Sequence, residues 1–200
     1  CLLHGVTSSG KTEIYIKLIE DQIAKGKQVL YLLPEIALTT QIVTRLKERF
    51  GDKVGVYHSN MNNSERVEVW KAVQEKNPER LQYSIILGTR SSIFLPFSNL
   101  GVIIVDEEHD SSYKQRQSLP RYNARDVSIY LAKLYDAKVL LGSATPSFES
   151  YYNTSIKKYA LVELDSRYGN ISMPKIEVVD IRKSYLKKEM NSHFSSYLLD

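Results

Sequence analysis

Cysteine is almost missing from the 200-residue chain, which carries a single one, at position 1. One cysteine cannot form an internal disulfide, and it cannot supply a zinc site built from several thiolates within these residues. Long hydrophobic runs are missing as well, since the longest apolar stretches, such as residues 29–33, fall far below the roughly 18 residues that span a bilayer. No secretory signal pattern is present. These absences predict a cytoplasmic protein without a membrane partner.

Charge of one sign is only slightly in excess, with 27 Lys and Arg against 23 Asp and Glu and a net charge of +4. That total is a weak argument for a polyanionic partner, but its distribution is more informative. Residues 111–125 contain no acidic residue and carry Lys114, Arg116, Arg121 and Arg125, with Tyr113 and Tyr122 among them. Such a segment is typical of a loop that binds phosphates and stacks on single-stranded bases. The alternative is a solvated surface loop.

Short apolar runs alternate with stretches of helical spacing through most of the chain. Strands are predicted at 28–33, 54–58, 84–88, 101–106 and 138–142, and helices at 12–25, 38–50, 64–76 and 123–135. This alternation predicts an α/β fold with a mostly parallel sheet, and the Val, Ile and Leu of the strands predict helices on both faces. Trp70 shares helical spacing with Val67 and Val73, which predicts a place in the core.

The regular pattern weakens after residue 149. Two further strands are expected at 159–164 and 176–181, and residues 182–200 are expected to form a connector. The first residue is Cys1 and not Met, so we expect the chain to be a piece of a longer protein.

Residues 5–12 match the phosphate-loop pattern G-x-x-x-x-G-K-[ST]. A strand is predicted before this loop and a helix after it, which aims backbone N–H groups and the helix dipole at phosphate oxygens. Lys11 is predicted to reach the terminal phosphates of ATP, and Thr12 to offer its hydroxyl to Mg²⁺. The nucleotide contacts are assigned to Gly5, Val6, Thr7, Ser8, Ser9, Gly10, Lys11 and Thr12. The alternative is a Gly-Lys turn after a buried strand.

A second apolar run, residues 102–105, ends in the acidic pair Asp106 and Glu107. Asp106 is predicted to hold Mg²⁺ together with Thr12, and Glu107 to orient or deprotonate the attacking water, so that Lys11, Asp106 and Glu107 are the predicted catalytic residues. In an open α/β sheet, ligands bind at the carboxyl ends of the strands. The phosphate loop, Asp106 and residues 143–145 all follow predicted strands, so we expect them to converge.

The order of these segments resembles that of the superfamily 2 helicases, and among them the bacterial primosomal replication-restart helicases. The residues that carry the resemblance read Leu33-Pro34-Glu35-Ile36-Ala37-Leu38-Thr39, Tyr57-His58-Ser59, Gly88-Thr89-Arg90-Ser91-Ser92-Ile93-Phe94, Asp106-Glu107-Glu108-His109-Asp110, Ser112-Tyr113-Lys114-Gln115, Arg121-Tyr122-Asn123-Ala124-Arg125-Asp126 and Leu141-Gly142-Ser143-Ala144-Thr145-Pro146-Ser147. The tyrosine-bearing insert between the acidic motif and the Ser-Ala-Thr motif is the most specific. The resemblance implies a RecA-like P-loop NTPase domain over residues 1–165, the first motor domain, and a connector over 166–200.

The resemblance also implies the activity and the partners. It implies an ATP- and Mg²⁺-dependent motor in the bacterial cytoplasm that moves 3′→5′ on single-stranded DNA at stalled forks. The implied partners are single-stranded and forked DNA, single-strand-binding protein and primosome loading proteins. Zinc is expected only in a second motor domain outside these residues. An arginine from that domain is expected to complete the ATP site, so we expect the chain alone to bind nucleotide but to hydrolyse it slowly.

The resemblance assigns two further groups of residues. His109, Ser143, Ala144 and Thr145 are expected to couple the nucleotide site to DNA, although a histidine at this place could instead be a capping or core residue. The expected DNA contacts are Thr89, Arg90, Tyr113, Lys114, Arg116, Arg121, Tyr122 and Arg125. Arg90 could instead form an ordinary ion pair at a helix start.

Two positions depart from the family pattern. Ser8 stands where many members have glycine, and a negative φ is expected to let serine adopt the loop. Asn123 stands where histidine is more familiar. Two other functions stay open, namely an RNA-directed ATPase of the same superfamily and a nucleotide-gated binding module without catalysis of its own.

Overall fold

The computed structural model describes residues 1–35, 40–77, 80–117, 119–170 and 175–199. The chain divides into two compact parts, Cys1–Asn170 and Ile171–Asp200. The smaller part contains α6 (Ile181–Leu186), β8 (Met190–Asn191), β9 (Phe194–Ser195) and α7 (Ser196–Leu199). All the predicted site residues belong to the larger part.

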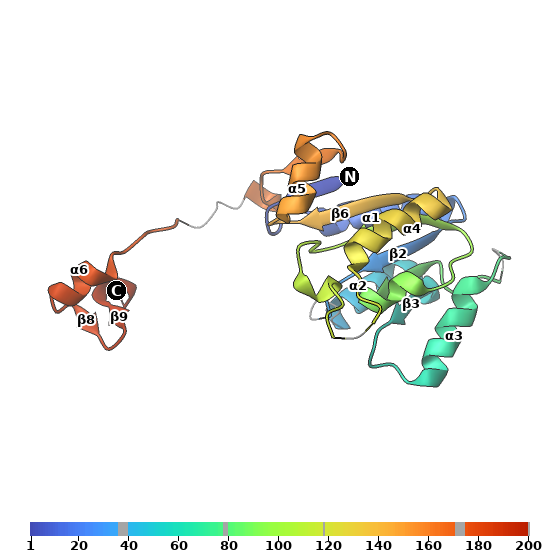
Figure 1. The fold of residues 1–200 in the computed structure, drawn as a ribbon, viewed down its shortest axis with the longest axis horizontal. Helices are drawn as coiled ribbons and strands as arrows, with labels where there is room; N and C mark the ends of the chain where they lie inside the picture. Colours follow the sequence, from blue (N-terminus) through green and yellow to red (C-terminus); the bar gives the residue numbers. More distant parts are fainter. Residues whose placement is uncertain (36–39, 78–79, 118, 171–174, 200) are drawn as a thin grey trace. The chain divides into compact units, whose positions relative to one another are not determined.

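The larger part is built on a seven-stranded sheet (Figure 1) with the strand order β3-β4-β2-β5-β6-β1-β7. Its strands are β1 (Leu2–Gly5), β2 (Gln28–Leu32), β3 (Val54–Tyr57), β4 (Ile85–Gly88), β5 (Leu100–Val105), β6 (Lys138–Ser143) and β7 (Leu161–Leu164). Each described pairing between neighbouring strands is parallel. The predicted α/β fold with a parallel sheet is confirmed.

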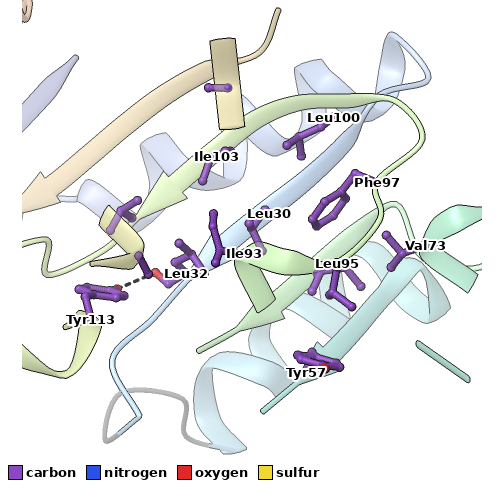
Figure 2. Packing of buried hydrophobic residues seen from close by; sticks show 14 of the residues in the cluster. Leu30, Leu32, Tyr57, Val73, Ile93, Leu95, Phe97, Leu100, Ile103 and Tyr113 are labelled. Carbon is purple, nitrogen blue, oxygen red and sulfur yellow. Dashed lines mark hydrogen bonds between the residues drawn. The ribbon is translucent and has the colours of Figure 1, made fainter. Parts of the chain in front are cut away.

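Helices cover both faces of this sheet because its strands are apolar on both sides. Alternate residues of one strand enter different clusters, so that Leu30 and Leu32 of β2 lie in one and Val29 and Tyr31 in the other. The first cluster includes buried residues of α3 (Asn63–Gln74) and α4 (Ala124–Tyr135), and the second includes those of α1 (Lys11–Ala24) and α2 (Thr40–Phe50). Figure 2 shows the first cluster.

Two predictions about individual segments are wrong. Residues 176–181 were predicted as a strand, but residues 175–180 form no strand and Ile181 begins α6, and Ile176 and Val178 are exposed. Trp70 is 44% exposed, whereas Val69 and Val73 of the same helix are buried. Helical spacing fitted two neighbouring faces of α3, and the face that contains Val69 is the one that packs on the sheet.

The parallel sheet brings the ends of its strands to one edge. The phosphate loop follows β1, Asp106 follows β5, and Thr89 follows β4. Ser143 is the last residue of β6, which lies between β5 and β1. Of the helices in the described ranges, none is long and apolar enough to cross a membrane.

Candidate nucleotide site and its links to the nucleic-acid surface

The phosphate loop leads directly into α1. Gly10 precedes the helix with φ 91°, in the left-handed region that favours glycine, and no side chain caps the first turn. The Lys11 ammonium donates to the carbonyl oxygens of Gly5 at 2.8 Å and Val6 at 3.4 Å. The Ser9 hydroxyl is buried without a hydrogen-bond partner among the described residues. Free N–H groups at a helix start, beside an ammonium group, can bind an anion.

Ser8 does not have the negative φ that the sequence led us to expect. Its φ is 64°, so the loop requires a left-handed residue at this position, where serine is less favourable than glycine. The loop is held on its other side by β7 and the segment after it. The Val6 N–H donates to the Leu164 carbonyl oxygen at 3.2 Å, and the Tyr168 N–H donates to the Ser8 carbonyl oxygen at 2.9 Å.

Asp106 lies at the end of β5 and accepts hydrogen bonds from two buried tyrosines. Tyr15 of α1 donates to Oδ1 at 3.0 Å, and Tyr31 of β2 donates to Oδ2 at 3.1 Å. Burial raises the pKa of Asp106, while the tyrosine hydrogen bonds and the Lys11 ammonium act in the opposite direction. Neither tyrosine was predicted as a site residue, because nothing in the sequence indicated that α1 and β2 bring these two hydroxyls to Asp106.

Glu107 has a positive φ of 47°. Its N–H donates to Asp106 Oδ1 at 3.1 Å, and one of its carboxylate oxygens lies 3.7 Å from His109 Nδ1. Burial, followed by the charge of Asp106, raises the pKa of Glu107, and Lys11 opposes this rise. A strained backbone and a raised carboxyl pKa are features that gather at functional sites. Lys11 therefore acts electrostatically on both predicted carboxylates.

The hydroxyl oxygen of Thr12 and the carboxylate oxygens of Asp106 are suitable ligands for magnesium. Both are hard oxygen ligands, as Mg²⁺ prefers, and Mg²⁺ at a nucleotide site usually takes one or two protein ligands besides phosphates and waters. The described residues include no group of three or more His, Cys, Asp and Glu side chains that could hold a metal ion by themselves.

The residues predicted to couple the site are in contact. His109 Nδ1 lies 2.8 Å from the Ser143 hydroxyl, and His109 Nε2 lies 3.4 Å from the Thr145 hydroxyl. The Thr145 N–H donates to the Ser143 hydroxyl oxygen at 2.9 Å. Ala144 lies between the two and is half-buried. The acidic motif after β5 and the Ser-Ala-Thr motif after β6 thus share one hydrogen-bond network.

Sequence reasoning missed the part played by Glu108. Its carboxylate is buried and accepts from Arg125 at 3.1 Å, from the Ser150 hydroxyl at 2.7 Å, and from both the N–H and the hydroxyl of Ser147 at 2.7 and 3.0 Å. Ser147 is also the N-cap of α5 (Phe148–Ser155). The acidic motif is thereby fixed to the start of α4 and the start of α5. A third carboxylate in a row was the only sequence signal.

Three predicted DNA contacts do not face solvent. Tyr113 is 1% exposed, and its hydroxyl lies 2.6 Å from the Asp106 carbonyl oxygen and 3.1 Å from that of Leu32 (Figure 2). Arg125 is 9% exposed and forms ion pairs with Glu108 and Asp126. Thr89 is 2% exposed at the end of β4. The composition of residues 111–125 indicated their basic and aromatic character, but not which of their side chains pack inward.

The other members of the basic segment lie on the surface. Lys114, Arg116 and Arg121 are exposed. Arg90 donates to the carbonyl oxygens of Ser112 at 3.0 Å and Lys114 at 3.4 Å, so it holds the first part of the segment in place. A shallow pocket of about 280 Å³ here is lined by Arg90, Ser111, Ser112, Lys114, Gln115, Arg116 and Gln117.

An aromatic pair flanks this basic surface. Tyr122 packs edge-to-face on Phe94, with ring centroids 4.9 Å apart, and the Phe94 side chain is half exposed. Phe94 was not predicted as a site residue, although it stands four residues after Arg90 in the same motif. Exposed aromatic rings next to basic side chains can stack on bases.

Comparison with protein families decides the assignment, because the family model described as DEAD/DEAH box helicase matches residues 1–154. The chain belongs to the DEAD/DEAH box helicase family. This membership confirms the resemblance to superfamily 2 helicases and implies, for the family in general, the use of ATP and Mg²⁺.

Curated relatives of this helicase-family chain are replication restart proteins named PriA. It is 46% identical over 199 residues to the protein of Rickettsia felis and to that of Bacillus subtilis, and 47% identical over 190 residues to that of Haemophilus influenzae. These alignments cover 100%, 100% and 95% of this chain, but only 30%, 24% and 25% of the relatives. The chain therefore spans less than a third of each relative and corresponds to a first motor domain of the PriA type.

Solved structures share the fold of this helicase domain. The C-terminal domain of the DEAD-box protein Dbp5 superimposes with a TM-score of 0.54 at 9% identity, covering 82% of this chain and 88% of that one. The Pyrococcus furiosus Hef helicase domain gives a TM-score of 0.52 at 19% identity, covering 85% of this chain and 36% of that one. These likenesses confirm the RecA-like fold.

Proposed function

We propose that this chain is the ATP-binding first motor domain of a replication-restart helicase, and that it couples ATP hydrolysis to 3′→5′ movement on single-stranded DNA at stalled forks. One observation carries the proposal. Tyr15, on the helix that begins at Lys11, donates a hydrogen bond to Asp106 Oδ1 at 3.0 Å, which supports a common site for the phosphate loop and the acidic motif. The family and the PriA relatives support the same function.

Each residue has a separate part in the proposed reaction. Lys11 exchanges its contacts with Gly5 and Val6 for the terminal phosphates of ATP. Thr12 and Asp106 hold Mg²⁺, which when bound neutralises charge on the phosphate oxygens. Glu107 orients the attacking water and takes up its proton, a role that a raised carboxyl pKa favours. An arginine from a second motor domain completes the site.

The proposed DNA surface is narrower than the one predicted from sequence. Lys114, Arg116 and Arg121 bind phosphates, and Tyr122 with Phe94 offers an aromatic edge to a base. Forked DNA, single-strand-binding protein and primosome loading proteins are the proposed partners, and the bacterial cytoplasm the proposed location, because the relatives are bacterial replication restart proteins.

ATP hydrolysis by the intact protein tests this function. We expect single-stranded DNA to stimulate hydrolysis more than single-stranded RNA of the same sequence, and Lys11→Ala to abolish both hydrolysis and unwinding. Stronger stimulation by RNA would favour an RNA-directed ATPase. Partner binding without hydrolysis, unaffected by Lys11→Ala, would favour a nucleotide-gated binding module.

A further inference from the structure

Asp106 is surrounded by tyrosines from separate elements. Tyr15 comes from α1, Tyr31 from β2, and Tyr113 from the segment after the acidic motif. All three side chains are at most 1% exposed. Each of their hydroxyls lies within hydrogen-bond distance of an oxygen atom of Asp106.

The three hydroxyls hold different atoms of the same residue. Tyr15 donates to Oδ1 and Tyr31 to Oδ2, at 3.0 and 3.1 Å. The Tyr113 hydroxyl lies 2.6 Å from the backbone carbonyl oxygen. With a donor on each carboxylate oxygen, rotation of the carboxylate about its χ2 torsion breaks at least one hydrogen bond.

The surroundings are built to admit the Tyr15 hydroxyl. Gly142 of β6 faces it, and a Cβ atom at that position would lie 1.8 Å from the hydroxyl oxygen and 3.5 Å from Asp106 Oδ1. The rings of Tyr15 and Tyr31 pack edge-to-face with centroids 5.6 Å apart. A side chain at residue 142 would displace the hydroxyl, so the position of the Tyr15 hydroxyl requires glycine at residue 142.

Tyr15 also links the two halves of the candidate site. It stands four residues after Lys11 on α1, so the two side chains project from the same side of the helix. The hydrogen bond to Asp106 therefore ties the phosphate-loop helix to the end of β5.

Building on the proposed function, we infer that Tyr15 and Tyr31 are positioning residues that set the magnesium requirement of ATP binding. They hold the Asp106 carboxylate in the orientation that receives the ion. Groups that orient a metal ligand typically affect metal affinity by about 10- to 100-fold.

The test measures ATP affinity of the intact protein by calorimetric titration, over a series of Mg²⁺ concentrations and in EDTA. The variants are Tyr15→Phe and Tyr31→Phe, which remove only a hydroxyl. The control is Tyr135→Phe, which removes a hydroxyl that donates to the Phe97 carbonyl oxygen at 2.8 Å, away from Asp106. Thermal unfolding of each protein reports the structural cost.

For the two site variants we expect the Mg²⁺ concentration that gives half of the affinity gain to rise by about 10-fold or more. Their ATP affinity in EDTA, and the ATP affinity and Mg²⁺ dependence of the control, should match the wild type. An unchanged Mg²⁺ dependence in both variants overturns the inference, as does an equal loss of affinity with and without Mg²⁺. A wild-type protein without Mg²⁺-dependent ATP binding instead overturns the proposed function.

Discussion

The ring of His109 and the hydroxyl of Ser143 lie 2.8 Å apart, at the ends of two neighbouring strands of the sheet. This contact links the acidic motif directly to the Ser-Ala-Thr motif. Ser143→Ala removes it and also removes the acceptor for the Thr145 N–H. In the intact protein we expect it to reduce unwinding and the stimulation of ATP hydrolysis by DNA, with little change in ATP affinity.

Ser155→Ala is the control for that experiment, because its hydroxyl makes a hydrogen bond to the Tyr152 carbonyl oxygen at 2.8 Å, at an exposed position of α5. Full DNA stimulation in Ser143→Ala would show that this contact does not couple the two sites.

Glu108 and Arg125 form a buried ion pair whose loss should be costly. Their side chains are 0% and 10% exposed. Arg125→Met leaves the carboxylate of Glu108 without its cation, which we expect to lower the free energy of unfolding by about 3–5 kcal/mol. Urea denaturation measures this change.

The exposed pair of Arg45 and Glu13 provides the comparison. Arg45→Met should cost about 1 kcal/mol or less, because exposed ion pairs contribute little. Equal costs for Arg45→Met and Arg125→Met would contradict the structural role given to Glu108.

At position 8, a glycine variant should be more stable than an alanine variant, which reverses the usual order. At most positions glycine is less stable than alanine, but the φ of 64° at Ser8 penalises any side chain with a Cβ atom. We therefore expect Ser8→Gly to be more stable than Ser8→Ala by about 1 kcal/mol in chemical denaturation. If Ser8→Ala is the more stable variant, residue 8 does not have this backbone conformation.

Glu107 should contribute a pH-dependent loss of stability. Its pKa in the folded state is raised above the usual 4.5, so the ionised carboxyl costs folding free energy above the folded-state pKa. Below the unfolded-state pKa both states are protonated and the cost vanishes. Glu107→Gln should therefore stabilise the protein at neutral pH, and this gain should disappear as the pH falls below 4.5.

Unfolding curves across the acidic range check this expectation. Glu68→Gln, a change at an exposed glutamate of α3, is the control. A gain from Glu107→Gln that persists at low pH would mean that ionisation is not its cause.

Much of the fold could be predicted from the sequence, because the patterns that indicate strands, helices and turns are local. Apolar runs such as residues 101–106 predicted strands that the structure contains, and the glycines of the phosphate loop predicted the turn before α1. Trp70 and residues 176–181 were mispredicted because periodicity shows that a face is apolar, but not whether another element packs against it.

The site was only partly predictable for a similar reason. The types of Lys11, Asp106 and His109 indicated their chemistry, so motif reasoning assigned them to the site. Tyr15 and Glu108 act through contacts between elements far apart in the sequence, and nothing in their local pattern indicates those contacts. Tyr113 was predicted as a DNA contact, but its ring packs in the core.

The central claim is that residues 5–12 bind the phosphates of ATP, and equilibrium binding of Mg·ATP to the intact protein tests it most directly. Lys11→Ala removes a charged donor, so we expect affinity to fall by about 10- to 100-fold. Lys17→Ala, which removes an exposed lysine of the same helix paired with Glu20, should bind like the wild type. Equal affinity in the wild type and Lys11→Ala would contradict the account.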